Sequence, residues 1–266
     1  MIFHSWFRVS MSLHFTSDLL TKCASSFKQC VRGYHLINEV PIKESVWETI
    51  NSLIFKHAGV AVMSQANGSH LSGKDISSII GNFSNKSAKY ETSLHDRFDI
   101  SSYRLNSVCS FNDPGNAADI VAGINAKKNF QYYSIIAREE CSGNQIHYDW
   151  LIIPADHPAM DPSCYAWSPL LGKRGKKKDV QTGWKTDENN GSSMSIIFGM
   201  SSQLWISIYI TNEMKQNYII ASTRASKLTI MDYVQLAEIH PEEPHLEEPP
   251  PDFPSCVNDT CKNESL

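Results

Sequence analysis

The sequence lacks the long apolar runs and the nucleotide or hydrolase motifs that identify many protein classes. Its longest apolar segments, such as Trp205–Ile210, are far shorter than the roughly 20 residues that a membrane helix needs. It has no GxxxxGK[ST], GxGxxG, GxSxG or HExxH motif, and no internal repeat. We therefore expect a soluble protein that is not a P-loop nucleotide hydrolase, a dinucleotide oxidoreductase, a serine hydrolase or a zincin.

Cysteine is present without a pattern. The seven cysteines form neither the paired CxxC spacing of a zinc site nor a disulfide framework; they are Cys23, Cys30, Cys109, Cys141, Cys164, Cys256 and Cys261. Met1–Phe15 is interrupted by charged and polar residues and is followed by no small-residue cleavage site, so it does not resemble a secretory signal. Met11 is an equally good start. These features predict reduced thiols in a cytoplasmic protein.

The chain also lacks an excess of positive charge. Its formal net charge of -4 argues against a protein that coats nucleic acid by bulk attraction, although a localised basic groove remains compatible with it. Much of the acidity lies in the tail after Glu238, which is rich in Glu and Pro. Such a composition cannot bury a core, and we expect residues 236–266 to be disordered.

The hydrophobic pattern predicts an ordered body of mixed helices and strands. Val46, Ile50 and Ile54 recur at helical spacing, and Gly59 ends that helix. Further expected helices and strands follow: strands near 75–76, 83–91 and 100–108, a helix at 117–127, and strands at 130–138, 146–153, 193–198, 203–210 and 218–221. We predict an N-terminal helical arm (1–40) and a single domain (41–235) of the α/β (α+β) class, with a mixed central β-sheet flanked by helices.

The segment from Ser69 to Glu91 carries the main candidate site. Alternate side chains of a strand share a face, so Asn85, Ser87, Lys89 and Glu91 point one way. If the segment ending in Asp75 pairs with this strand, the Asp75 carboxylate lies beside Ser87 and Lys89. A carboxylate and an ammonium in this arrangement suit phosphodiester hydrolysis assisted by a hard divalent cation, for which Mg²⁺ is the natural candidate.

The two segments Gly68–Asp75 and Phe83–Lys89, with the order of elements around them, resemble the PD-(D/E)xK nucleases and in particular the type II restriction endonucleases. The resemblance covers roughly residues 40–154. It implies a restriction-endonuclease-like core and a homodimer that cuts double-stranded DNA at specific sites with Mg²⁺. It also implies that Asp75 binds the metal, that Lys89 assists catalysis and that Glu48 supplies a helix carboxylate.

The sequence departs from the family pattern at two positions. Lys74 precedes Asp75 where Pro is usual, and Ser87 stands where a second carboxylate is expected. Because a serine cannot neutralise a cation, another acid must serve, and Glu91 and Glu48 are the candidates. Asp75 as a turn residue that bonds backbone amides and Lys89 as a solvated strand residue are the structural alternatives.

A basic loop between Trp167 and Trp184 is the candidate DNA contact. Its cations are Lys173, Arg174, Lys176, Lys177 and Lys178, with Lys185 further on. Such a loop suits a phosphate backbone. It equally suits a solvated loop, a nuclear localisation signal, or a non-enzymatic nucleic-acid-binding protein that grips its ligand with residues 172–185. An interaction protein that works through the acidic tail is a third possibility.

Five further residues resemble a metal-ligand cluster: His147, Asp149, Asp156, His157 and Asp161. Their spacing matches no zinc pattern. The sequence therefore predicts that they belong to a surface loop.

Overall fold

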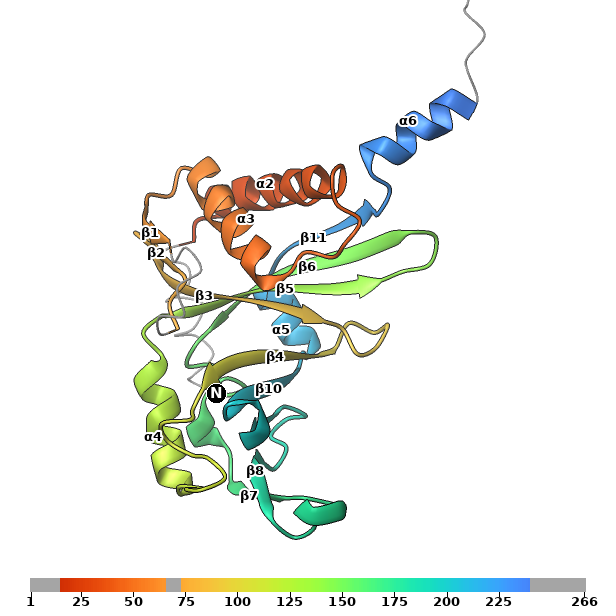
Figure 1. The fold of residues 1–266 in the computed structure, drawn as a ribbon. Coiled ribbons are helices and arrows are strands. Elements are labelled where there is room, and N and C mark those ends of the chain that lie inside the picture. The colour runs from red at the N-terminus through yellow and green to blue at the C-terminus, as the bar shows by residue number, and fades with distance from the viewer. Residues whose placement is uncertain (1–14, 66–72, 240–266) are drawn as a thin grey trace, which may run out of the picture.

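The computed structural model describes residues 15–65 and 73–239 (Figure 1). The N-terminal 14 residues, the Gly68–Ser72 part of the segment that carries the family resemblance, and the tail from residue 240 lie outside the described residues. The described chain forms two sheets, with helices over one of them. The layers run from the helices through the first sheet to the second sheet.

The first sheet is mixed, which confirms the predicted α+β class. Its strand order is β1-β2-β3-β5-β6-β11. The strands are β1 (Val62–Gln65), β2 (Ile76–Ser78), β3 (Gly81–Lys89), β5 (Tyr132–Glu140), β6 (Gln145–Pro154) and β11 (Ile219–Ser226). Strands β3 and β5 pair in parallel and all other neighbours pair antiparallel. The parallel pair requires a crossover, and β4 and α4 lie within it.

Two helices cover one face of this sheet. Helix α2 (Ser17–His35) begins at Thr16, whose side chain accepts a hydrogen bond from the Leu19 amide. Helix α3 (Glu44–His57) ends before Gly59, which has a φ of 85°. Their buried aromatic residues pack on the sheet around Trp150; these are Phe27, Trp47 and Phe55. The helix expected within residues 1–40 is therefore present and packs against the body.

A second sheet covers the opposite face of the first. Its order is β4-β10-β9-β8-β7, and all its pairs are antiparallel. The strands are β4 (Arg97–Arg104), β10 (Gln203–Tyr209), β9 (Ser193–Ile197), β8 (Gln181–Thr186) and β7 (Trp167–Leu171). Apolar side chains from both sheets, including Ile135, Leu151, Ile100 and Ile206, form one continuous core between them.

The remaining elements are short. They are α4 (Ala117–Lys127), α5 (Asn212–Tyr218), α6 (Ile230–Ile239) and the 3-10 turns η1 (Pro162–Cys164), η2 (Gly175–Lys177) and η3 (Phe198–Met200). Helix α4 coincides with its expected range, whereas the strand expected at 100–108 begins and ends earlier as β4. Strands β7 and β8 were not predicted. Within residues 15–65 and 73–239, no helix combines the length and the apolar character needed to cross a bilayer.

Candidate carboxylate and lysine site

The register of the β2–β3 hairpin decides which residues meet Asp75. The pairs are Ser78 with Gly81, Ser77 with Asn82, and Ile76 with Phe83. A two-residue turn between Ser78 and Gly81 fixes this register. Asp75, the next residue along, donates its amide to the Phe83 carbonyl at 2.8 Å. The side chain of Asp75 therefore lies at the level of the start of β3.

Two groups of β3 hold the Asp75 carboxylate. Its Oδ2 accepts hydrogen bonds from the Asn85 amide at 2.5 Å and from the Ser84 hydroxyl at 3.3 Å. Gly73 sets the approach of the chain: its φ is 65°, and a Cβ there would come within 2.5 Å of the Lys127 carbonyl oxygen. The carboxylate is thus fixed at the edge of the sheet, beside Ser84.

Lys86 brings a cation to the same place. It follows Ser84 on the same face of β3, and its side chain is only 10% exposed. Its Nζ donates to Glu44 Oε1 at 2.7 Å, so the first turn of α3 reaches the edge of β3 here. Glu48 lies one turn further along α3, on the same side of the helix as Glu44.

The pKa directions show that these charges interact. Burial, together with the nearby carboxylates of Asp75 and Glu44, raises the pKa of the Glu48 carboxyl to about 7 against the opposing effect of Lys86. Burial also raises the pKa of Asp75, while Lys86 and the bond from the Asn85 amide oppose that rise. Burial alone lowers the pKa of Lys86, but the charges of Glu44 and Asp75 outweigh it, so the net shift is upward.

This group can hold a hard divalent cation. Mg²⁺ takes oxygen ligands and needs only one or two protein carboxylates, which Asp75 and Glu48 supply. Burial is the largest cause of both raised pKa values, and the positive charge of a bound cation would favour the ionised form of both carboxyls. Glu44 is engaged by Lys86 and is placed to orient that ammonium.

The predicted partners Lys89, Ser87 and Glu91 do not meet Asp75, and that prediction was wrong. Lys89 lies four residues beyond Asn85, about 13 Å further along an extended strand. It is exposed and lies 3.9 Å from Glu140 Oε1. Glu91 is also exposed, beyond the end of β3, where its amide donates to Arg97. Ser87 belongs to the other face of the strand.

That other face of β3 is polar for a structural reason. Asn85 and Asn51 of α3 are fully buried, and the Asn51 amide donates to Asn85 Oδ1 at 2.6 Å. The same amide donates to the Ser134 hydroxyl at 2.8 Å, which also accepts from the Trp150 indole at 2.9 Å. The face that looked catalytic in the sequence is therefore a helix–sheet contact held by hydrogen bonds of Asn51, Asn85 and Ser134, while Asn51 Oδ1 and Asn85 Nδ2 are buried without a partner among the described residues.

The sequence contained a signal for the residues that the structure places near Asp75. Ser84-Asn85-Lys86 has the same Ser-x-Lys spacing as Ser87-Ala88-Lys89, and the hairpin register selects the first triplet. Of the predicted site residues, Asp75 and Glu48 lie near enough for the charge of Asp75 to raise the pKa of Glu48. Glu44, Ser84 and Lys86 were not singled out by the sequence. Ser84 is not an acid, and the other carboxylates that influence Asp75 and Lys86 here belong to α3.

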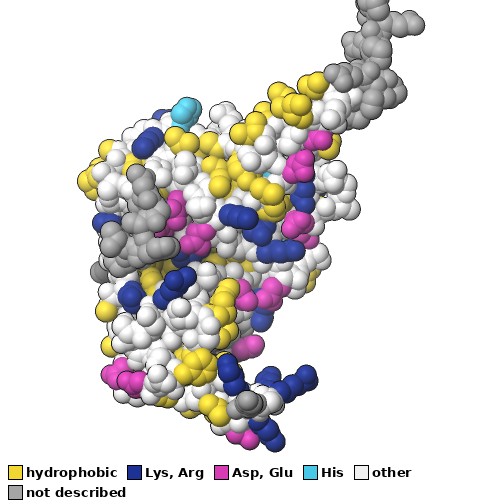
Figure 2. Space-filling view, viewed as in Figure 1, with side chains coloured by type: hydrophobic (Ala, Val, Ile, Leu, Met, Phe, Trp, Pro, Cys, Tyr) yellow, Lys and Arg dark blue, Asp and Glu magenta, His cyan; other side chains and the backbone are white. Residues whose placement is uncertain are grey.

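The basic loop lies at the other end of the molecule. It connects β7 and β8, and Figure 2 shows its Lys and Arg side chains projecting from the second sheet. Lys173, Arg174, Lys177 and Lys178 are exposed. Lys177 Nζ lies 4.7 Å from the centre of the Phe111 ring. Lys185 is an exposed residue of β8, and the side chain of Lys176 lies outside the described parts of the structure.

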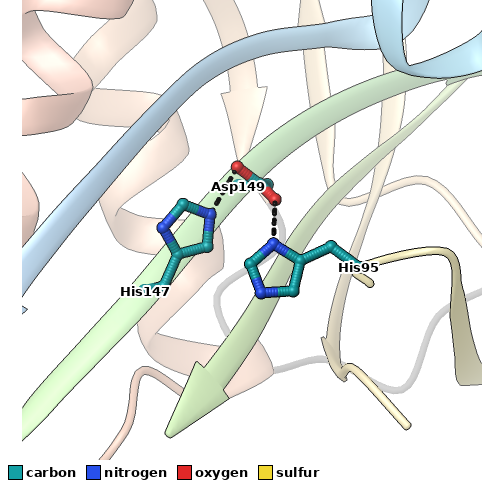
Figure 3. Close-up of side chains that lie close together, drawn as sticks. All are labelled: His95, His147 and Asp149. Atoms are coloured by element: carbon teal, nitrogen blue, oxygen red, sulfur yellow. Dashed lines mark hydrogen bonds and ion pairs between the residues drawn. The ribbon is translucent and has the colours of Figure 1, made fainter. Parts of the chain in front are cut away.

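The five residues expected in a surface loop are divided between different elements, which corrects that prediction. His147 and Asp149 lie in β6, whereas Asp156, His157 and Asp161 follow that strand. His147 and Asp149 instead meet His95, which comes from the connection between β3 and β4 (Figure 3). No pattern in the sequence pointed to His95, because this residue is distant from both partners along the chain.

Comparison of the chain with protein-family models, with curated proteins and with solved structures gives no match. Its function must therefore be inferred from the residues themselves.

Proposed function

We propose that the protein is a magnesium-dependent endonuclease that hydrolyses phosphodiester bonds of double-stranded DNA. The observation that carries the proposal is the Asp75 carboxylate held on β3 near the buried Lys86, which pairs with Glu44, and near Glu48 one turn along α3. Two carboxylates and an ammonium at one edge are the groups needed to hold a metal ion and a phosphate together. Asp75, followed on the next strand by Ser84 and Lys86, still resembles the motif of the PD-(D/E)xK nucleases, with Ser84 at the position of the second acid.

Each residue has a distinct role in this proposal. Asp75 and Glu48 would hold Mg²⁺, and the bound ion would supply Lewis-acid activation of the phosphate and of water. Ser84 donates to Asp75 and fixes its orientation. Lys86, held by Glu44, donates to the phosphate oxygens and stabilises the charge that develops as water attacks phosphorus and the bond to the leaving oxygen breaks.

The preference for DNA rests on charge. The β7–β8 loop presents Lys173, Arg174, Lys177 and Lys178 to solvent, and such side chains bind a phosphate backbone without reading its sequence. Cutting both strands of a palindromic site calls for two-fold symmetry, so we propose a homodimer of the type II restriction kind.

The experiment is a digest of linear plasmid with the purified full chain, with Mg²⁺ and with EDTA. We expect fragments only with Mg²⁺, and none from the Asp75→Asn variant. This variant keeps an oxygen that can accept from the Asn85 amide, so circular dichroism should show an unchanged fold. Cleavage that persists in EDTA, or at the normal rate in a folded Asp75→Asn variant, would overturn the proposal.

The exposed basic loop also favours a second candidate, a non-enzymatic nucleic-acid-binding protein. In that case Asp75 serves only to bond the Ser84 hydroxyl and the Asn85 amide. Magnesium separates the two functions. A pure binding protein retains DNA in a filter or gel-shift assay with EDTA and never cuts it, and Lys173→Ala with Lys177→Ala weakens the retention.

A further inference from the structure

A second group of chemically active side chains lies on the same face of the first sheet as Lys86. Cross-strand pairing places Asp149 opposite Ala137, which in turn pairs with Ala88 of β3. His147 is two residues before Asp149 and therefore points to the same face. His95 reaches this face from the β3–β4 connection, with a left-handed φ of 52°. Strand β6 and the β3–β4 connection thus bring two imidazoles and one carboxylate together (Figure 3).

The distances suit a common ligand. One donor atom from each of the three residues lies within 4.8 Å of the other two. His147 Nε2 is 2.9 Å from Asp149 Oδ1, and His95 Nδ1 is 3.9 Å from Asp149 Oδ2. A tetrahedral ion with bonds of about 2.0–2.1 Å holds neighbouring ligand atoms roughly 3.4 Å apart. The two distances of 2.9 Å and 3.9 Å lie on either side of this value, so small movements of the side chains would bring the ligand atoms to it.

The groups behind these donors are those that orient metal ligands. Glu139 Oε2 lies 2.5 Å from His95 Nε2, so it accepts from that nitrogen and leaves Nδ1 of the same ring free to face the cluster. Asp149 accepts from the Tyr90 hydroxyl at 2.8 Å and from the Ser222 hydroxyl at 2.5 Å. The Glu139 carboxylate therefore orients the His95 ring, and the Tyr90 and Ser222 hydroxyls orient the Asp149 carboxylate.

The cluster is also accessible to an ion. The side chains of His95, His147 and Asp149 are 22%, 14% and 4% exposed, so the acid is buried beneath two partly open imidazoles. Nδ1 of His147 is buried without a hydrogen-bond partner in the described structure. The internal hydrogen bonds therefore do not use all the polar atoms of the cluster.

We propose that His95, His147 and Asp149 bind a divalent transition-metal ion of the Zn²⁺ class. Imidazole ligands favour Zn²⁺ over Mg²⁺, which prefers oxygen. Three protein ligands leave a fourth position for water, as in sites where zinc takes part in chemistry. The backbones of Asp149 and Lys86 are about 12 Å apart by strand geometry, so this ion is separate from the Mg²⁺ of the proposed nuclease site.

The test is zinc binding by the full-length protein, freed of metal with EDTA and then titrated with ZnCl₂ in a calorimeter. We expect one tight Zn²⁺ per chain, with affinity at least about 10-fold lower in His95→Ala. His95 lies in a connection, so this variant should fold. Glu139→Gln, which changes only the group behind His95, should weaken binding by about 10- to 100-fold.

Two controls make the result specific. His57→Ala removes an exposed imidazole of α3, and Asp75→Asn removes a carboxylate of the other site; both should bind Zn²⁺ as the unaltered protein does. Co²⁺ should give the visible absorption bands of a four-coordinate ion, lost in His95→Ala. Absence of stoichiometric Zn²⁺, or equal affinity in His95→Ala, would show a hydrogen-bonded cluster without metal. Neither result depends on DNA cleavage.

Discussion

The two faces of strand β3 carry similar polar residues and do different things. On one face Asn85 is fully buried and bonds Asn51 of α3. On the other, Ser84 bonds Asp75 and Lys86 bonds Glu44 at the open edge of the sheet. Polarity along a strand is therefore not enough to locate a site. The candidate site lies on the face where charged side chains interact with other charged side chains, as Lys86 does with Glu44.

The largest expected difference between the faces is in DNA cleavage. Asp75→Asn removes the charge that we propose to hold the cation, and we expect a rate lower by at least about 10²- to 10³-fold. Ser87→Ala changes the opposite face and should leave the rate per folded molecule unchanged. The measurement is the initial rate of plasmid cleavage at saturating Mg²⁺. Equal loss in both variants would remove the distinction between the faces.

The next effect is on stability and belongs to the helix-facing side. Asn51→Ala leaves the side-chain oxygen of Asn85 without its buried donor, and the Ser134 hydroxyl keeps only the bond from the Trp150 indole. We expect a loss of about 1–3 kcal/mol in the free energy of unfolding, read from the urea midpoint. The surviving folded fraction should cleave DNA normally. A stable but inactive Asn51→Ala variant would place this face in catalysis.

A smaller effect depends on pH. The pKa of Glu48 is about 7 in the folded protein against a reference of 4.5. Because the folded state holds this proton more tightly, Glu48 destabilises folding as pH rises from 4.5 through about 7. We expect Glu48→Gln to be more stable than the unaltered protein by about 1 kcal/mol at pH of about 8, after allowance for solvent screening, and equal to it at pH of about 4.

Magnesium provides the control for this prediction. The metal should stabilise the unaltered protein at pH of about 8 and should stabilise Glu48→Gln less, because only the carboxylate offers a charged ligand. Thermal unfolding with and without Mg²⁺ measures both shifts. Equal Mg²⁺ stabilisation of the two proteins would remove Glu48 from the metal site.

The smallest expected effect is at Lys89. Its ion pair with Glu140 is long and exposed, so Lys89→Ala should change the free energy of unfolding by less than about 0.5 kcal/mol. Chemical denaturation measures this directly. A loss of several kcal/mol would mean that Lys89 has partners beyond this pair.

The sequence predicted local elements better than their pairing. Helices α3 and α4 and strand β6 follow from apolar spacing and from stops such as Gly59. The β2–β3 register did not follow, because its turn consists of Ile79 and Ile80, which lack turn chemistry, and Ile79 is 63% exposed. In the sequence, Gly81 looked like a turn residue, but in the structure it is the first residue of β3.

Neither the assembly of the second sheet nor the histidine cluster could be predicted from the sequence, for a related reason. Strands β7 and β8 contain Pro169 and Gly183, residues that weaken the pattern of a strand. His95 meets His147 only after the β3–β4 connection folds over the sheet. Long-range contacts of this kind leave no local periodicity in the sequence.

The most direct test of the central claim compares two lysines of the same strand. Lys86→Met and Lys89→Met each replace an ammonium with an unbranched apolar side chain. Circular dichroism is used to check that both variants are folded before cleavage is measured. We expect Mg²⁺-dependent cleavage to be lost in Lys86→Met and retained in Lys89→Met. Normal cleavage by folded Lys86→Met, or its loss only in Lys89→Met, would contradict the account.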